Sequence, residues 1–361
     1  MIRFSTPRPA AALAFLALAA CGSANCGSPK ALFKPPLHPS VESLYAPHQR
    51  GDRFFNPWAE SDIGLFDLIR WRILSTNEYD AARKHPPDVP VVANDGSRLH
   101  AGGDDPSVTW IGHATLVVED GGDTWITDPF FSDTLVLGKE RLHPPGIPLD
   151  AIPTPLFSVV SHDHYDHLDL PTIEKLPAET VLCVPLGIGD LVRGPHHQRV
   201  AELDWWQSVH VGDWTLTLVP SQHMSRRGAF GNVTLWGGWV IEGHGRRYYF
   251  AGDTGYFHGF REIGRKFGPI DVAMLPIGAF APRWFMQYVH MDPAQALQAF
   301  QDLGARYMIP MHWGTFDLSD EPLDEPPRAL HAATAQHPDL EGRVRVLAIG
   351  ETFDIPPTPG S

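Results

Sequence analysis

Short apolar runs separated by turn residues dominate the chain from Ser107 onward. Two of these runs predict strands on either side of Gly112-His113-Ala114, at 108–111 and 116–118. Further strands are predicted at 125–127, 156–160, 181–185, 216–219, 235–241, 248–250, 272–275, 307–309 and 344–349. Helices are predicted between them at 169–176, 258–267, 293–303 and 326–335. This alternation predicts an α/β fold in which two sheets are covered by helices.

The first residues have the pattern of a targeting segment. Arg3 and Arg8 precede an apolar stretch, 10–20, that is too short to span a bilayer. It ends in Leu18-Ala19-Ala20-Cys21, which resembles a bacterial lipobox. We therefore expect residues 1–21 to be a lipoprotein signal peptide with Cys21 lipidated, and an ordinary secretory signal is the alternative. By the same resemblance, Gly22 rather than Asp after the cysteine favours a place in the bacterial cell envelope, at the outer membrane of a two-membrane bacterium and facing the periplasm.

Three segments are expected after the signal peptide. Residues 22–53 are rich in Ser, Pro, Gly and Ala and are predicted to be a tether. Residues 54–106 are predicted to be an N-terminal extension, and 107–356 the main α/β domain. The aromatic stretch 54–74, with a helix near 61–73, is expected to pack on that domain, and a lipid-facing surface is the alternative.

Composition restricts the partners and the redox chemistry. With 42 acidic and 28 basic residues among 361, the formal charge is −14, which argues against binding of nucleic acid. Only Cys26 and Cys183 remain besides the lipobox cysteine, so no disulfide framework is expected. No oligomeric state follows from the composition.

The run His162-Asp163-His164-Tyr165-Asp166-His167 follows directly on the predicted strand 156–160. A strand end delivers side chains at fixed positions, and the loop after it can curl around a cation. The first two histidines, two residues apart, point to one side, while the Asp-His pair on the turn faces a second cation. Imidazole and carboxylate groups suit zinc, and also iron or manganese.

Three further predicted strands each end in one polar residue that suits a metal. His223 follows 216–219, Asp253 follows 248–250 and His312 follows 307–309. Each alone is more typical of a structural residue, but four strand ends carrying such groups indicate metal binding. The chain has neither a Gly-x-Ser-x-Gly elbow nor a P-loop, in keeping with hydrolysis that needs no protein nucleophile.

The order H-x-H-x-D-H, then His, Asp and His, resembles the metallo-β-lactamase superfamily. This resemblance implies an αββα sandwich, two mixed β-sheets flanked by helices, with two divalent ions, zinc by default, holding a hydroxide as nucleophile. It implies one ion bound by His162, His164 and His223, a second bound by Asp166, His167 and His312, and Asp253 bridging both. Asp128 matches an early aspartate of the superfamily that orients a ligand.

Several stretches resemble, more specifically, the N-acylphosphatidylethanolamine-hydrolysing phospholipase D family. They are 56–58, 109–115, 252–256, 282–286 with 290–293, and 312–316. This resemblance covers most of residues 54–320. It implies a phosphodiesterase that hydrolyses an N-acylated phospholipid to phosphatidic acid and N-acylethanolamine.

The catalytic residues expected from this resemblance are Asp166, Asp253 and His290. His290 matches a family histidine near the site, where it binds substrate or protonates the leaving alkoxide; a histidine at a helix start is the alternative. Arg226-Arg227 suits a lipid phosphate or is a solvated basic pair. His113 is expected to have a structural role in the turn at Gly112-His113-Ala114, and a contact with a metal ligand is the alternative.

Two other functions compete with the phospholipase. One is a hydrolase of the same fold that acts on a lactone or a small phosphate ester. The other is a non-catalytic, lipid-binding lipoprotein. Retention of all seven presumed ligands argues against the latter, because buried histidines and aspartates without a metal are costly.

Overall fold

The computed structural model describes residues 40–61, 63–100, 105–136, 138–194, 199–228 and 231–357. The predicted signal peptide, Cys21, Cys26 and residues 22–39 of the predicted tether lie outside the described residues. The predicted boundaries between the segments therefore stay predictions.

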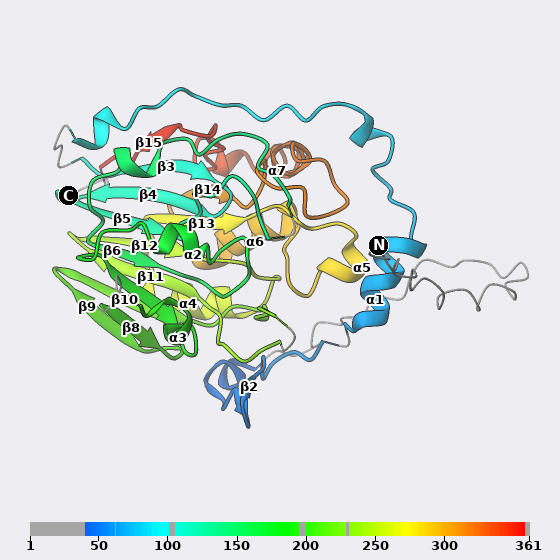
Figure 1. The fold of residues 1–361 in the computed structure, drawn as a ribbon. Helices are drawn as coiled ribbons and strands as arrows, with labels where there is room; N and C mark the ends of the chain where they lie inside the picture. The colour runs from blue at the N-terminus through cyan, green and yellow to red at the C-terminus, as the bar shows by residue number, and fades with distance from the viewer. Residues whose placement is uncertain are drawn as a thin grey trace, which may run out of the picture. The chain divides into compact units, whose positions relative to one another are not determined.

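Two mixed β-sheets form the body of the described chain (Figure 1). The seven-stranded sheet has the order β15-β3-β4-β5-β6-β7-β8, with antiparallel pairs from β15 to β5 and parallel pairs from β5 to β8. Its strands are β3 (Ser107–Gly112), β4 (Thr115–Asp120), β5 (Asp123–Thr127), β6 (Phe157–Val159), β7 (Val181–Pro185), β8 (Val200–Leu203) and β15 (Thr352–Asp354).

The six-stranded sheet has the order β14-β13-β12-β11-β10-β9, parallel from β12 to β14 and antiparallel elsewhere. Its strands are β9 (Ser208–Val211), β10 (Trp214–Val219), β11 (Gly238–Gly243), β12 (Arg246–Phe250), β13 (Val272–Pro276) and β14 (Tyr307–Met311). A separate hairpin consists of β1 (Gln49–Arg50) and β2 (Arg53–Phe54).

Helices lie against the sheets. Three of them pack together beside the six-stranded sheet: α4 (Gly259–Phe267), α6 (Pro293–Leu303) and α7 (Glu325–Thr334). α6 begins at a capping box in which the Asp292 carboxylate accepts the N–H of Gln295, and it ends at Gly304 with a φ of 63°. The shorter helices are α1 (Leu65–Ile69), continued by a π-helical turn (Arg70–Leu74), α2 (Leu170–Ile173), α3 (Gly189–Val192) and α5 (Arg283–Met286). Short 3₁₀ turns occur at Val41–Tyr45, Ala82–Lys84, Ser97–His100, Leu149–Ala151 and Pro338–Leu340.

The main core fills the space between the two sheets with aromatic side chains. The Trp125 ring of β5 lies 5.3 Å from the Tyr248 ring of β12 and 6.0 Å from the Trp214 ring of β10. The Trp239 indole of β11 donates a hydrogen bond to the carbonyl of Val160, 2.9 Å away. Side chains of this size contribute several kcal/mol each on burial, on the order of 25 cal/mol per Å². They fix the spacing of the two sheets and, with it, the positions of the loops at the strand ends.

The predicted α/β architecture with two mixed sheets is confirmed, and most predicted strands and helices are present within a few residues. The predicted strand 344–349 is wrong: it makes only isolated bridges at Val344 and Ile349, and the strand that closes the sheet is β15. The run 235–241 also begins too early, because β11 starts at Gly238. Cys183 is a buried free thiol.

The stretch 54–74 divides between the core and the surface. Phe54, Trp58 and Trp71 are buried. Phe66 and Ile73, in contrast, project from the helical segment into solvent. In the described part of the chain, no helix combines the length and the apolar character needed to cross a bilayer.

Candidate metal centre

The seven predicted ligands lie together beside the ends of four strands. The loop after β6 carries the first four, and β10, β12 and β14 each lead into one of the others. All seven side chains come from loops that the two sheets hold against each other, so residues as far apart in the sequence as Asp166 and His312 meet, with 3.5 Å between Asp166 Oδ2 and His312 Nε2. Their ligand atoms form two clusters.

The first cluster consists of His162, His164, His223 and Asp253, with ligand atoms all within 4.8 Å of one another. His164 Nδ1 lies 2.8 Å from His162 Nε2 and 3.2 Å from His223 Nε2. Three ring nitrogens therefore converge on one point. The Asp253 Oδ2 atom lies 3.9 Å from His162 Nε2 and 3.8 Å from His223 Nε2.

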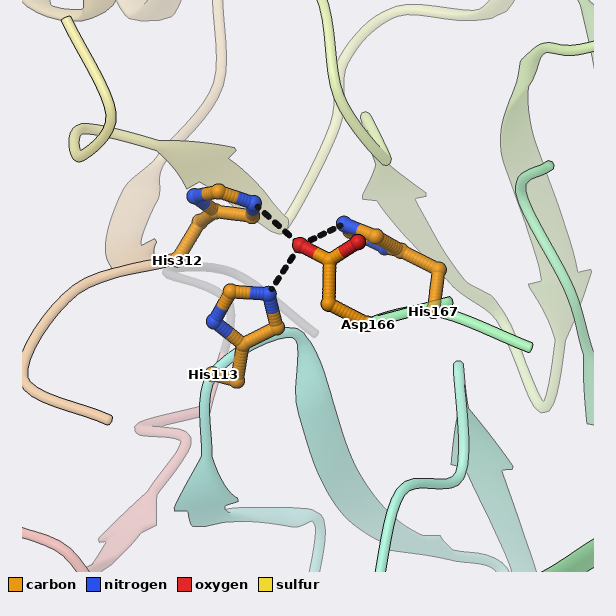
Figure 2. Close-up of side chains that lie close together, drawn as sticks. All are labelled: His113, Asp166, His167 and His312. Atoms are coloured by element: carbon orange, nitrogen blue, oxygen red, sulfur yellow. Dashed lines mark hydrogen bonds and ion pairs between the residues drawn. The ribbon is translucent and has the colours of Figure 1, made fainter. Parts of the chain in front are cut away.

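The second cluster consists of Asp166, His167, His312 and also His113, as Figure 2 shows. Asp166 Oδ2 lies 3.6 Å from His167 Nε2, 3.5 Å from His312 Nε2 and 3.0 Å from His113 Nε2. Asp253 reaches this cluster as well, because its carboxylate oxygens lie 3.2 Å from His167 Nε2 and 3.2 Å from His312 Nε2. Asp253 thus stands between the two clusters.

Hydrogen bonds on the far side of the rings set which nitrogen faces the clusters. His167 Nδ1 donates to Asp128 Oδ2 at 2.7 Å, and His223 Nδ1 donates to the carbonyl of Val289 at 3.0 Å. The Ser161 hydroxyl donates to the Asp128 carboxylate and accepts from His162 Nδ1. Since a carboxylate and a carbonyl only accept, each Nδ1 carries the proton, and each Nε2 offers a lone pair to the cluster.

Several atoms at the centre are buried and lack a hydrogen-bond partner, and this is the observation that a metal ion explains. His167 Nε2, His312 Nε2 and Asp253 Oδ1 are all in this state, although they lie close together. Leaving such atoms unpaired costs about 1–3 kcal/mol each. Nitrogen and carboxylate donors are the ligands that zinc and other divalent transition metals prefer. The residues present therefore fit divalent metal ions, one at each cluster.

The charges of these groups also suit a cation. Burial lowers the pKa of His162 and of His223 well below the usual value, so both rings are neutral. Burial alone would raise the pKa of Asp253, but the imidazoles of His167 and His312 outweigh it and hold that pKa well below its usual value. Burial would lower the pKa of His312, but the carboxylates of Asp253 and Asp166 raise it to about 9. A cation bound there would take the place of that proton.

The backbone is strained at the centre. His113, Asp128 and His312 have φ values of 53°, 30° and 62°, in the left-handed region that side chains other than glycine rarely adopt. Gly252, before Asp253, has a φ of 58°, and a Cβ there would lie 2.3 Å from the Cβ of Ser161. Strain of this kind persists only where neighbours hold the chain firmly, and it is typical of functional sites.

His113 contributes both to its turn and to the site. Its backbone N–H donates to the Thr315 hydroxyl, and its carbonyl accepts the N–H of His312. The same turn points the ring at Asp166 Oδ2, 3.0 Å away. The two roles that the sequence left as alternatives therefore coexist.

His290 lies at the edge of the centre. Its Nδ1 atom is 3.9 Å from Asp253 Oδ2, and its ring is 5.5 Å from that of His223. The Arg283 guanidinium donates to the carbonyl of His290, and α5 and α6 bracket the residue. Its Nδ1 is buried without a hydrogen-bond partner.

The two arginines after His223 differ from each other. Arg227 donates from Nη1 to the carbonyls of Asp163 and Leu168, and its guanidinium lies 4.4 Å above the Tyr165 ring. It braces the loop that carries four of the ligands. Arg226 is exposed, and its backbone N–H donates to the Asp163 carboxylate.

Asn56 is a site residue that sequence reasoning missed. Its side-chain amide donates to the carbonyl of His223 at 2.9 Å and to the Tyr288 hydroxyl at 2.7 Å, and its Oδ1 accepts from the Trp236 indole. The residue lies 167 positions from His223, so no local pattern marks the contact. The sequence marked Asn56 only as part of the family motif at 56–58.

Replacing Asn56 with alanine should lower the free energy of unfolding by about 2 kcal/mol and weaken metal binding by about ten- to a hundredfold. The reason is that the carbonyl of His223 loses a buried donor, so the ring is less well aligned. Chemical denaturation and competition with a chromogenic chelator measure the two effects. Asn94→Ala is the matched control, because Asn94 donates to the carbonyl of Gly350 and touches no ligand. Equal metal affinity in both variants would contradict this role.

Comparisons with known proteins agree with the fold and with a metal-dependent hydrolase family. A model of the beta-lactamase superfamily domain matches residues 124–313. An uncharacterized protein of Mycobacterium tuberculosis is 38% identical over 332 residues, covering 86% of each chain. The N-acyl-phosphatidylethanolamine-hydrolyzing phospholipase D 1 of Caenorhabditis elegans is 39% identical over 228 residues, covering 58% of this chain and 64% of the nematode protein.

Solved structures share the fold at low sequence identity. An isothiocyanate hydrolase from Delia radicum gut bacteria has a TM-score of 0.56 and 18% identity, covering 68% of this chain and 98% of that protein. The mixed sheets, the two His/Asp clusters and these matches lead to one assignment. The chain belongs to the beta-lactamase superfamily and is a metal-dependent hydrolase related to N-acylphosphatidylethanolamine-hydrolysing phospholipase D.

Proposed function

We propose that this chain is a metal-dependent phosphodiesterase that hydrolyses N-acylphosphatidylethanolamine to phosphatidic acid and N-acylethanolamine. Hydrolysis is supported by the buried, unpaired donor atoms of two clusters that share Asp253. The substrate class is supported by the similarity to the nematode phospholipase D, which spans 58% of this chain. We take zinc as the metal, because nitrogen and oxygen donors suit it.

The ligands in this proposal are the seven residues at the strand ends. One ion would be held by His162, His164 and His223 and the second by Asp166, His167 and His312, and Asp253 lies where it could contribute to both. Divalent ions in such a pair activate water near neutral pH and neutralise charge on the substrate phosphate. Other residues of the chain orient these ligands by hydrogen bonds. The Asp128 carboxylate accepts from His167 and from the backbone of Ser161, and His113 donates to Asp166.

His290 binds the substrate as a neutral imidazole in this proposal. Burial lowers the pKa of His290 to about 4, although the negative charge of Asp253 acts to raise it. A neutral ring at pH 7 lacks the acidic proton of an imidazolium, and its remaining N–H is too weak an acid to protonate a leaving alkoxide, so a hydrogen bond to the substrate is the better role. Its unpaired Nδ1 is free to make that bond.

Replacing His290 with glutamine should therefore lower kcat/KM about ten- to a hundredfold, by the same factor for poor and good leaving groups. N-acylphosphatidylethanolamine and phosphatidyl p-nitrophenol supply the two leaving groups on one phosphatidyl unit. If His290 is instead the general acid, kcat/KM should fall about 10²–10⁴-fold for N-acylphosphatidylethanolamine, whose leaving group is an alkoxide, and should change little for phosphatidyl p-nitrophenol. That difference would overturn the substrate-binding role.

The proposed reaction is tested by hydrolysis in ¹⁸O-labelled water. Water adds its oxygen to phosphorus, the bond from phosphorus to the ethanolamine oxygen breaks, and that oxygen takes up a proton. Mass spectrometry should find the label in phosphatidic acid and none in N-acylethanolamine. Release of diacylglycerol, or no cleavage by metal-loaded protein, would exclude the proposed reaction.

The runner-up function is hydrolysis of a lactone or a small phosphate ester at the same site. The metal-dependent hydrolases among the relatives favour it, since a UPF0173 protein of Pyrobaculum aerophilum is 31% identical over 217 residues. Turnover of bis(p-nitrophenyl) phosphate or of a lactone, with N-acylated phospholipid untouched, would favour this reading. A non-catalytic lipoprotein would turn over none of them.

We also propose that lipidated Cys21 anchors the chain in a bacterial cell envelope, at the outer membrane. Replacing Cys21 with serine should then move the protein from the membrane pellet to the soluble fraction, because no acyl chain is attached. Cell fractionation followed by immunoblotting measures this. Unchanged sedimentation of the variant would contradict the anchor.

A further inference from the structure

The candidate ligand His312 differs from its neighbours on the side of the ring that faces away from the centre. His167 Nδ1 donates to the Asp128 carboxylate at 2.7 Å, which leaves its Nε2 free to bind a metal. His312 presents Nε2 to Asp166 at 3.5 Å, and its other ring nitrogen points away from that carboxylate (Figure 2). Among the described residues, His312 Nδ1 is buried and has no hydrogen-bond partner. A neutral ring that offers Nε2 to a metal carries its proton on Nδ1, and that proton needs an acceptor.

A small cavity adjoins the His312 ring. Its volume is about 10 Å³, and its lining includes His312, Trp313 and Glu321. A polar cavity of about this volume holds one water molecule. Within the described part of the chain, the indole Nε1 of Trp313 is a second buried donor without a partner. Two residues whose buried donors need acceptors therefore line a space that admits one water.

Glu321 brings a buried carboxylate to the same cavity. Its Oε1 atom accepts the N–H of Phe280 at 3.0 Å, and its Oε2 atom accepts the N–H of Ala281 at 2.9 Å. The Ser319 side chain is a further hydrogen-bond partner. A carboxylate accepts about four hydrogen bonds, so Glu321 can accept one more. The carboxylate is thus held in place by its neighbours and still has capacity toward the cavity.

We propose that one buried water bridges His312 and Glu321. The water accepts from His312 Nδ1–H and from the Trp313 indole, and it donates to the Glu321 carboxylate. About three hydrogen bonds are usual for a buried water, and such a bridge is nearly as favourable in enthalpy as a direct hydrogen bond. Glu321 is then a positioning residue that acts through the water on His312. The inference rests on the proposed function only for the metal at the second cluster, and it needs no particular substrate.

A crystal structure of the zinc-loaded protein tests the bridge directly. The full chain carries Cys21→Ser, so that no acyl group is attached. An ordered water should lie about 2.7–3.2 Å from His312 Nδ1 and from one oxygen of Glu321. A cavity without ordered water, or a direct hydrogen bond from His312 Nδ1 to a protein acceptor, would overturn the proposal.

Replacing Glu321 with glutamine should weaken the binding of one of the two zinc ions about ten- to a hundredfold. The reason is that the amide has a single accepting oxygen for two backbone N–H groups and the water. Competition with a chromogenic chelator measures the affinity. In the cobalt-loaded protein, the visible absorption band of the ion at the second cluster should also shift, because that band depends on the orientation of the ligands.

Glu202→Gln is the matched control for a purely structural role. Glu202 Oε1 accepts the N–H groups of Gly187 and Gly189 at 2.6 and 3.1 Å, so it fixes a loop in the way that Glu321 does. It belongs to neither cluster. This variant should bind both zinc ions and show the cobalt spectrum of the parent, although its free energy of unfolding should fall. Equal loss of metal affinity in the two variants, or unchanged affinity in Glu321→Gln, would contradict the positioning role.

A second variant separates the water from the loop that Glu321 fixes. That loop lies close to His312, since a Cβ at Gly278 would lie 2.0 Å from the carbonyl oxygen of His312. Trp313→Phe leaves Glu321 and the loop in place but removes one hydrogen bond to the water. It should weaken the same zinc ion about two- to tenfold and shift the same cobalt band. A shift in Glu321→Gln with none in Trp313→Phe would assign the effect to the loop and reject the water.

The bridge and the proposed function fail in different ways. A parent chain that contains the water and binds two ions, but does not cleave N-acylphosphatidylethanolamine, would reject the proposed reaction and leave the bridge in place. Cleavage of that lipid by a chain whose crystal structure has no water between His312 and Glu321 would do the reverse.

Discussion

Replacing Asp253 with alanine should remove metal and activity together, lowering kcat/KM by at least about four orders of magnitude. Asp253 is the residue on which both clusters depend, since its carboxylate lies 3.2 Å from His167 Nε2 and 3.2 Å from His312 Nε2, and near His162 and His223 as well. Without it, the imidazoles lose the negative charge that holds them together. Elemental analysis and the phosphodiester assay, on one preparation, measure both effects.

Asp163→Asn is the matched control for that substitution. Asp163 is a buried carboxylate in the same loop as four of the ligands, but it belongs to neither cluster and accepts the backbone N–H of Arg226. The asparagine variant should keep its metal and most of its activity. Normal activity in Asp253→Ala, or loss of metal in Asp163→Asn alone, would contradict the assignment of Asp253 to the centre.

The second large effect is expected at Asp128. Alanine at this position should lower the free energy of unfolding by about 3 kcal/mol and the affinity for metal by about ten- to a hundredfold. The Asp128 carboxylate accepts three hydrogen bonds, from the backbone N–H and hydroxyl of Ser161 and from His167 Nδ1. All three groups are buried, so the two N–H groups and the hydroxyl proton of Ser161 would each be left without an acceptor.

Asp128→Asn separates the two effects. The Oδ1 of the asparagine still accepts from the Ser161 backbone, so most of the free energy of unfolding that the alanine variant loses should be recovered. Its amide nitrogen cannot accept from His167 Nδ1–H, so the affinity for metal should stay low. Metal titration and urea denaturation of the two variants test this. If asparagine restores metal affinity to the parent value, Asp128 does not act by orienting His167.

The clustering of the seven candidate ligands was predictable because each of their loops follows a recognisable apolar strand. His223, Asp253 and His312 are separated by many residues, but strand ends that meet at one place bring them together. The pattern of short runs likewise predicted the two sheets. Here the local signal and the tertiary structure agree, as expected where a buried strand positions a functional loop.

The rest of the site depends on contacts that leave no local pattern. Asn56 supports His223 from the N-terminal extension, and the turn of His113 points its ring at Asp166, which depends on the backbone φ of the turn. The run 344–349 is apolar because it packs on the body, with only isolated bridges to Met308 and Val91. The outward face of 65–74 depends on which side Trp71 anchors. Periodicity finds such a face without showing whether it is covered.

The most direct test of the account is to purify residues 22–361 without added metal, determine bound metal by elemental analysis and assay N-acylphosphatidylethanolamine in the same sample, with and without chelator. The account predicts about two divalent ions per chain, zinc foremost, and release of phosphatidic acid that chelator abolishes and zinc restores. Protein that contains no metal, or hydrolysis that chelator leaves unchanged, would contradict it.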